Sequence, residues 1–223
     1  MNREIDIDAR AFIVRHTRLS PAPLVPEIVL YQASDMLGLW QKMADRQDSA
    51  PPPYWAFAWA GGQAVARYIL DHPGVVADKT VLDLGTGSGL CAIAAPRAGA
   101  AHVKAVDVDP YCVDAVALNA EANGVAVEVA LADLLGGPAP SVDIVLAGDV
   151  CYEEPFADRA LAWLADAHSH GVAVLIGDPS RAHFPHEMMT RLARYDVPTP
   201  RTLEGATTTP TGVYTFAERL SKP

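Results

Sequence analysis

Three glycines in the segment VLDLGTGSGL have a spacing that could serve chemistry. Gly85, Gly87 and Gly89 follow a β-prone run and precede a helix-prone run, so the backbone can turn sharply there and direct helix amides at a ligand. A dinucleotide-binding loop would need glycine at position 90, where this chain has Leu90. Asp83 stands two residues before the first glycine, where it could meet an ammonium group directly or through water. The loop predicts a ligand with an amino-acid moiety and no pyrophosphate; a tight turn without a ligand is the alternative.

Further acids follow the next two predicted strands. Asp107 ends the strand in VKAVDVDP, a position from which a carboxylate can accept both hydroxyls of a ribose. Asp109 precedes Pro110 and therefore favours a helix cap. Asp133 in LADLL could accept the amino group of an adenine, and a turn or helix cap is the alternative for it.

The segment GDVCYEEP ends the fourth predicted strand of the core, where open α/β sheets place their chemistry. Asp149 and Tyr152 are three residues apart on the loop leaving this strand, so both can face the reactive end of a ligand. Enzymes that methylate amide or base nitrogens commonly carry Asn- or Asp-Pro-Pro-aromatic here, and residues 149–152 lack both prolines. We interpret a bare carboxylate beside a phenol as suited to an aliphatic amine, which arrives as a cation and must lose its proton.

These residues need a scaffold that brings the carboxyl ends of several strands together. After residue 79, short apolar runs alternate with helical stretches, which predicts β-α units around a parallel sheet. The threonine-rich tail after residue 201 contains a Pro-Thr-Gly turn signal and predicts a closing β-hairpin. We expect strands at 80–84, 103–108, 127–131, 143–148 and 172–177, and helices at 89–98, 110–123, 155–167 and 186–195.

The first 53 residues differ from the rest of the chain. They contain scattered prolines, a mixed amphipathic stretch at 27–44 and the run Pro51, Pro52 and Pro53, which ends any preceding helix or strand. We therefore expect residues 1–53 to be an N-terminal extension packed on a core of residues 54–223, with one structural domain overall.

Composition excludes several classes of protein. The 223 residues include 17 Lys and Arg against 27 Asp and Glu, and this net charge of −10 disfavours a sequence-independent grip on nucleic acid. Three widely spaced cysteines and the absence of an 18-residue apolar run argue against a disulfide framework, a zinc knuckle and a membrane span. His168 and His170 lack a third ligand, so we expect no metal site there. The expected location is the cytoplasm.

Taken together, PPYWAFAWAGGQ, VLDLGTGSG, AVDVDP, LAGDVCYEE and VLIGDPSR resemble the electron-transfer flavoprotein β-subunit lysine methyltransferase family, within the seven-strand S-adenosylmethionine-dependent class. The resemblance begins near Pro26 and runs to the C-terminus. It implies an α/β, Rossmann-like sheet of order 3-2-1-4-5-7-6 with the seventh strand antiparallel. It also implies transfer of methyl groups from S-adenosylmethionine to lysines of the flavoprotein β subunit. We expect a monomer that uses no metal, nucleic acid or membrane. One departure is Ala60, where the family often has proline after the second tryptophan.

Carried over by position, the resemblance assigns roles to individual residues. Asp149 and Tyr152 would contact the target lysine, and Trp55 and Asp178 would border the substrate mouth, although Trp55 could equally be a core residue and Asp178 a turn former. Cys151 is interpreted as packing, because methyl transfer from a sulfonium needs no thiol. The cofactor-binding residues implied are Asp83, Gly85, Thr86, Gly87, Asp107, Val108, Asp133, Trp59 and Gln63.

Three other functions are weighed against this one. A methyltransferase acting on another protein or a small amine would share every motif. A nicotinamide-dependent dehydrogenase is disfavoured by Leu90 and by the lack of a Tyr-x-x-x-Lys pair. A non-catalytic S-adenosylmethionine-binding module is disfavoured by the presence of Asp149 and Tyr152.

Overall fold

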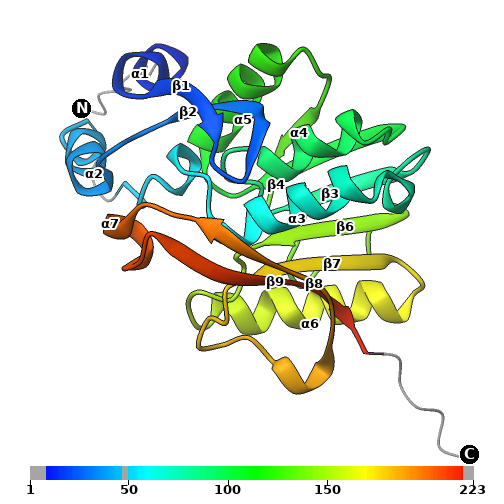
Figure 1. Cartoon of the computed structure of the whole chain (residues 1–223). Coiled ribbons are helices and arrows are strands. Elements are labelled where there is room, and N and C mark those ends of the chain that lie inside the picture. Colours follow the sequence, from blue (N-terminus) through cyan, green and yellow to red (C-terminus); the bar gives the residue numbers. More distant parts are fainter. Residues whose placement is uncertain (1–8, 47–49, 218–223) are drawn as a thin grey trace, which may run out of the picture.

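The computed structural model describes residues 9–46 and 50–217, and a seven-stranded sheet runs through the molecule (Figure 1). The sheet order β5-β4-β3-β6-β7-β9-β8 is the predicted order, and β9 is antiparallel to both neighbours, as expected for the seventh strand. The strands are β3 (Thr80–Leu84), β4 (His102–Asp107), β5 (Glu128–Leu131), β6 (Ile144–Gly148), β7 (Ala173–Asp178), β8 (Met189–Pro198) and β9 (Thr208–Phe216).

Alternating side chains of the central strands form two separate cores. Val81 and Leu146 face a layer made of α3 (Ala60–Asp71), α4 (Leu90–Arg97) and α5 (Pro110–Asn123), whereas Leu82 and Val145 face α6 (Phe156–Ser169). The period of two in a strand makes this two-sided burial possible, and it explains why the strands are almost wholly apolar. The predicted core strands are confirmed, and so are the predicted helices at 89–98, 110–123 and 155–167.

The predicted helix at 186–195 is wrong. A short 3₁₀ turn, η3 (His186–Met188), leads into β8, whose residues Ala193, Tyr195 and Val197 pack beneath α3 at every second position. This period of two belongs to a strand, and β9 supplies the hydrogen-bond partners, which lie outside residues 186–195. The closing hairpin expected after residue 201 is also wrong, because that segment holds one helix and one strand, and β9 pairs instead with β8, which lies before residue 201. The Pro-Thr-Gly sequence lies inside β9, and the connection contains α7 (Arg201–Glu204) instead.

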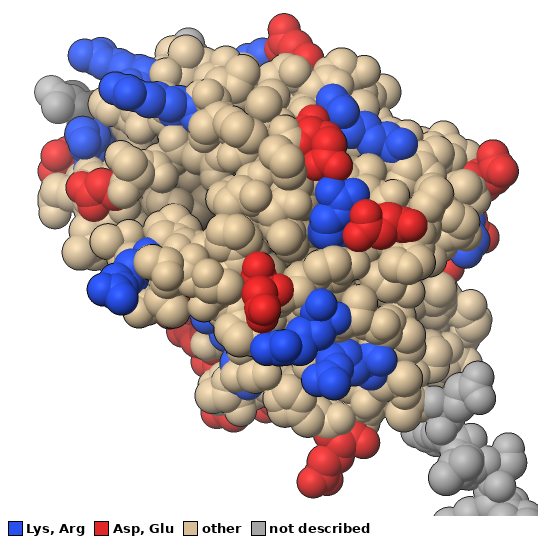
Figure 2. Space-filling model, in the orientation of Figure 1, with Lys and Arg blue, Asp and Glu red and all other residues tan. Residues whose placement is uncertain are grey.

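The described part of residues 1–53 forms α1 (Ala9–His16), a hairpin of β1 (Arg18–Ala22) and β2 (Val25–Gln32), and α2 (Met36–Ala44). Two asparagines of α5 hold β2: Asn119 Oδ1 accepts the Tyr31 amide, and the Asn123 side chain bonds both the amide and the carbonyl of Val29. On the face shown in Figure 2, Lys and Arg side chains lie over α1 and β1, with Asp and Glu side chains close by. A separate 3₁₀ turn, η1 (Tyr54–Ala56), then leads toward α3.

The helices of the described residues are all too short or too polar to cross a lipid bilayer.

Candidate active site

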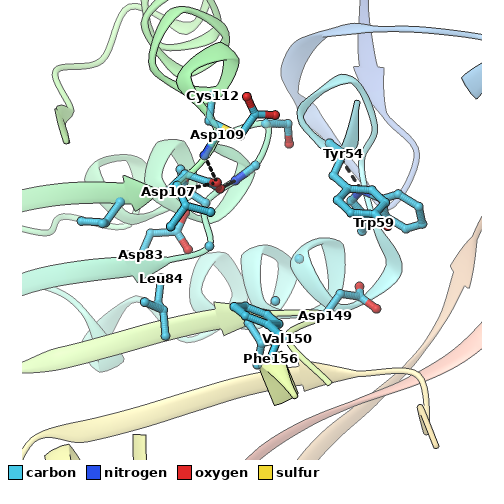
Figure 3. A pocket seen from close by; sticks show the side chains of 18 of the residues that line it. Tyr54, Trp59, Asp83, Leu84, Asp107, Asp109, Cys112, Asp149, Val150 and Phe156 are labelled. Carbon is cyan, nitrogen blue, oxygen red and sulfur yellow. Dashed lines mark hydrogen bonds between the residues drawn. The ribbon is translucent and has the colours of Figure 1, made fainter. Parts of the chain in front are cut away.

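A cavity of about 720 Å³ opens at the carboxyl ends of β3, β4 and β6 (Figure 3). Asp107 and Asp109 lie at one end of it, and Trp59 and Asp149 lie at the other. The cavity brings together ten of the thirteen predicted site residues. These are Trp59, Asp83, Gly85, Thr86, Gly87, Asp107, Val108, Asp133, Asp149 and Tyr152.

The glycine loop has the backbone that its sequence predicts. Gly85, Gly87 and Gly89 have φ of 62°, 51° and 81°, a left-handed conformation that other residues adopt only at a cost. The carboxylate of Asp83 stabilises the turn, because it accepts the Thr86 hydroxyl at 2.6 Å and the Ala92 amide at 3.0 Å. Burial raises the pKa of Asp83 to about 7.

Asp107 joins the glycine loop to the loop after β4. Its carboxylate accepts the amides of Gly87 at 2.9 Å, Val108 at 2.8 Å and Asp109 at 3.0 Å. Asp109 caps α5 as predicted, by accepting the Tyr111 amide, and burial raises the pKa of Asp109 to about 6. Among the described residues, no Lys or Arg forms an ion pair with Asp83, Asp107 or Asp109. Uncompensated carboxylates fit a ligand that carries cationic groups, and they oppose a pyrophosphate.

Asp133 is less available than the sequence suggested. Its Oδ1 accepts the Leu135 amide at 2.9 Å, and its Oδ2 is paired with Arg159 of α6 at 2.8 Å. The Arg159 hydrogen bond lowers the pKa of this exposed carboxyl. Arg159 also lines the cavity, and no sequence motif marked it.

Asp149 is not the bare carboxylate that we inferred. Its Oδ2 accepts the amide of Gly61, and its Oδ1 accepts Nε of Arg181 at 3.0 Å and Nη2 of Arg181 at 2.7 Å. Asp149 is buried and has φ of 58°, a left-handed conformation that is uncommon for a residue with a side chain. Burial raises the pKa of Asp149, whereas the charge of Arg181 opposes this rise. Arg181 belongs to the IGDPSR motif, yet nothing in the motif indicated its pairing with Asp149.

The amide of Gly61 reaches Asp149 because glycines let α3 approach the sheet closely. A Cβ atom at Gly61 would stand 2.2 Å from the Gly177 carbonyl oxygen, and one at Gly148 would stand 2.6 Å from Cα of Gly62. Such distances are impossible for real side chains, so the first turn of α3 lies directly on β6 and β7. The N-cap residue of α3 makes no side-chain cap hydrogen bond. Asp149, which directly follows β6, caps the helix instead by accepting the Gly61 amide.

Aromatic side chains line the rest of the cavity near Asp149. The ring of Tyr152 contacts those of Tyr54 and Phe156, each with centroids 5.4 Å apart, and Tyr54 also packs edge-on against Trp59 at 5.6 Å. The Trp59 indole donates to the Tyr54 carbonyl at 3.0 Å. Burial raises the pKa of Tyr152 to about 12, so its phenol stays neutral at physiological pH. Cys151 beside it is fully buried, in agreement with a packing role.

Three predicted site residues do not line the cavity. Trp55 is fully buried and stacks on Tyr111 with centroids 5.6 Å apart, so it belongs to the core. Both ends of the Gln63 amide are used in tying α3 to neighbouring loops, through the Leu24 amide and the Ala58 carbonyl. Asp178 is also fully buried and accepts the Arg181 amide at 2.8 Å, so it orders the loop that carries Arg181. Within the described residues, no group of three or more His, Cys, Asp or Glu side chains could hold a metal ion.

Comparisons with known proteins agree with this geometry. Residues 68–150 match the family model for ribosomal protein L11 methyltransferase. Among solved structures, ribosomal protein L11 methylase from Lactobacillus delbrueckii subsp. bulgaricus has a TM-score of 0.50 and 21% identity, over 71% of this chain and 79% of that one. Magnesium protoporphyrin IX methyltransferase from Synechocystis, solved with bound S-adenosylmethionine, has a TM-score of 0.50 and 18% identity, over 70% of this chain and 79% of that one. At these identities the two structures show a shared methyltransferase fold.

A much stronger match comes from sequence. The chain is 36% identical to the electron transfer flavoprotein beta subunit lysine methyltransferase of Rattus norvegicus, over 95% of this chain and 86% of that protein. The chain therefore belongs to the electron-transfer flavoprotein β-subunit lysine methyltransferase family.

Proposed function

We propose that this protein transfers methyl groups from S-adenosylmethionine to lysine side chains of the electron-transfer flavoprotein β subunit. One observation carries the chemistry: a single cavity extends from the glycine loop and Asp107 to Asp149 and Tyr152. Family membership over nearly the whole chain supports the acceptor. We further propose that the protein is a monomer and that it lies in the cytoplasm; the three free cysteines support the compartment.

In this proposal the cofactor occupies the end of the cavity with the glycine loop. The loop residues Gly85, Thr86 and Gly87, supported by Asp83, would hold the methionine part, and Asp107 and Val108 would hold the ribose. Asp133 would lie at the adenine, with Trp59 toward the methyl group. When bound, S-adenosylmethionine supplies an electrophilic methyl group on a sulfonium.

The protein's own residues must present a neutral, oriented amine to that methyl group. A free lysine has a pKa near 10.4, so keeping it neutral at pH 7.4 costs about 4 kcal/mol unless the site lowers its pKa. Apolar walls such as Val150 and Phe156 favour the neutral amine by desolvation, whereas the charge of Asp149 favours the ammonium. Because Asp149 is already paired with Arg181, it is better suited to orient the nitrogen than to act as a strong base. The neutral phenol of Tyr152 can accept from or donate to the same nitrogen.

The test is incubation of the purified chain with isotope-labelled S-adenosylmethionine and the flavoprotein β subunit, followed by peptide mass spectrometry. We expect label on lysine, and calorimetry should show binding of S-adenosylhomocysteine but not of NAD. Parallel reactions with a cell extract and with small amines serve as controls. Label found only on another protein or on a small amine would contradict the proposed acceptor. Cofactor binding without methylation of the β subunit, the extract or the small amines would contradict the proposal that the protein is an enzyme.

A further inference from the structure

The pair of Asp149 and Arg181 extends to a third residue, Glu204, which the proposed function does not use. Arg181 follows β7 and lies between two carboxylates, Asp149 in the cavity and Glu204 at the end of α7. Its Nη2 donates to Asp149 Oδ1 at 2.7 Å and to Glu204 Oε1 at 2.9 Å, while Nη1 donates to Glu204 Oε2 at 3.0 Å. Since Nε also donates to Asp149, the guanidinium is held on two sides, by Asp149 and by Glu204.

The hydrogen bonds of the Asp149 carboxylate leave part of its acceptor capacity free for a ligand. Asp149 Oδ1 accepts two N–H groups from Arg181, which uses its capacity, whereas Oδ2 accepts only the Gly61 amide. One lone pair of Oδ2 is thus left, on a carboxylate that lines the cavity and cannot rotate without breaking three hydrogen bonds. The planar guanidinium, with several donors in a fixed arrangement, is well suited to hold both carboxylates at once.

Glu204 connects this arrangement to the wall of the cavity. Its side chain is 5% exposed although α7 is in a connection at the surface, so Glu204 turns inward to Arg181. The neighbouring Leu203 packs against the same hydrophobic cluster as Trp59, a cluster that includes Trp55 and Phe57. Figure 1 shows α7 on the same side of the molecule as the loop that precedes α3. Arg181 therefore links the connection between β8 and β9 to the end of the cavity that contains Asp149 and Trp59, which we call the acceptor end.

We propose that Arg181 and Glu204 are positioning residues for methyl transfer: Arg181, anchored by Glu204, orients the carboxylate of Asp149 so that Oδ2 receives the target lysine nitrogen. This inference rests on the proposed lysine methyltransferase function.

The two residues have opposite electrostatic effects on Asp149. Arg181 lowers the pKa of Asp149, and Glu204 raises it. The other ionisable groups around Asp149 are Asp178 on β7 and the buried thiols of Cys91 on α4 and Cys151 beside it. Burial raises the pKa of both thiols, and that of Cys151 to about 12, so they stay neutral. Burial raises the pKa of Asp178 to about 7, whereas the backbone amide and the charge of Arg181 lower it. Loss of the Arg181 charge therefore raises the pKa of Asp178 in the same direction as that of Asp149.

The experiment compares Arg181→Gln, Arg181→Lys and Glu204→Gln with wild type, with Arg194→Gln and Glu187→Gln as exposed controls. We measure S-adenosylhomocysteine affinity by calorimetry, and kcat, KM and the rate–pH profile for methylation of the flavoprotein β subunit. Arg181→Gln should lower kcat roughly 10- to 100-fold, since misplacing a reacting group by about 1 Å has an effect of that size. Arg181→Lys should recover part of the loss, and cofactor affinity should stay within about twofold for both.

The pH profile separates positioning from a merely structural role. Without the cation, Asp149 is protonated at higher pH, so the acidic limb should move to higher pH in Arg181→Gln. Without the Glu204 charge, the same limb should move to lower pH in Glu204→Gln. If Arg181→Gln fails to fold, the methylation rate and pH profile of Arg181→Lys and Glu204→Gln decide the question. The inference would be overturned if the variants kept the wild-type rate and the wild-type pH profile. It would also be overturned if the acidic limb moved in the same direction in Arg181→Gln and Glu204→Gln. Lack of lysine methylation by wild type would instead overturn the proposed function.

Discussion

The two ends of the cavity are built from contacts of very different range. At the cofactor end, Asp83 bonds Thr86 and Ala92, three and nine residues away, and Asp107 bonds Gly87, twenty residues away. At the acceptor end, Asp149 bonds Gly61 and Arg181, which are 88 and 32 residues away. The cofactor end is thus a local structure that its own motif specifies, whereas the acceptor end exists only when α3, β6 and β7 have packed together.

This difference predicts different responses to substitution. Changes at the cofactor end should alter ligand affinity and leave the rest of the fold intact, because Asp83 stabilises its own loop and Asp107 joins only two adjacent loops. Changes at the acceptor end should alter turnover and stability together, because the same hydrogen bonds hold the lysine site and the contact between α3 and the sheet.

The largest effect should follow substitution of Asp149. Asp149→Asn keeps the shape but removes the charge that orients the amine, and we expect turnover to fall by roughly 30-fold to nearly 1000-fold. Cofactor affinity should be nearly unchanged. Asp149→Ala should also destabilise the protein by about 1 to 3 kcal/mol, since the Gly61 amide and Arg181 each lose a hydrogen-bond acceptor while Arg181 keeps Glu204.

Single-turnover methylation and calorimetry on the same preparations measure both quantities for Asp149→Asn, with exposed Asp158→Asn as the control. Turnover within threefold of wild type, or a loss explained by failure to bind cofactor, would contradict the assignment of Asp149 to the lysine.

The glycines under the acceptor end should affect stability next most strongly. A Cβ at Gly177 would stand 2.0 Å from the Gly61 carbonyl oxygen, so Gly177→Ala must push α3 away from β7. We expect a loss of about 1 to 3 kcal/mol or more in the free energy of unfolding. Gly74→Ala meets no atom within 4 Å and should change stability by less than about 0.5 kcal/mol. Urea unfolding compares the two, and equal losses would show that close approach of α3 is not what these glycines provide.

The same contrast in range explains how much the sequence could predict. The five core strands, α5 with its Asp109 cap, and the glycine loop follow from neighbouring residues, and each is present. The error at 186–195 arose because β8 depends on β9, whose paired residues include Ala193 with Val213. The family resemblance supplied the sheet order, because the pattern within each strand does not say which strands lie side by side.

Prediction of the site residues from sequence has the same limit as prediction of the fold. Motif position placed Asp83, Asp107 and Asp149 correctly in one cavity. It could not show that Trp55 turns inward to Tyr111, or that Gln63 spends both ends of its amide on backbone partners. Nor could it find Arg181 as a partner of Asp149, because two separate strands must pair before their loops meet. Residue type and local spacing indicate which groups are available, and tertiary packing decides which of them remain free for a ligand.

At the cofactor end, Asp107→Ala should weaken S-adenosylhomocysteine binding by roughly 1.5 to 3 kcal/mol, about 12- to 150-fold, the range for losing a hydrogen bond to a charged group. Turnover at saturating cofactor should change much less. Titration calorimetry measures the affinity, with the exposed Asp158→Asn as the control. Affinity within threefold of wild type would contradict the placement of the ribose at Asp107.

The smallest effect should come from Asp133, although it was predicted alongside Asp107. Both of its oxygens already have partners, the Leu135 amide and Arg159, and its side chain is 47% exposed. A ligand must compete with water and with Arg159 there, so Asp133→Ala should weaken cofactor binding by less than about fivefold. Arg159→Ala offers the matched test, because it frees one oxygen of Asp133 for a ligand amino group. If Asp133 does contact adenine, Arg159→Ala should bind cofactor as tightly as wild type or more tightly, while the double variant should match Asp133→Ala. A loss at Asp133→Ala as large as that at Asp107→Ala would contradict this order and would show that the adenine contact contributes as much to affinity as the ribose contact.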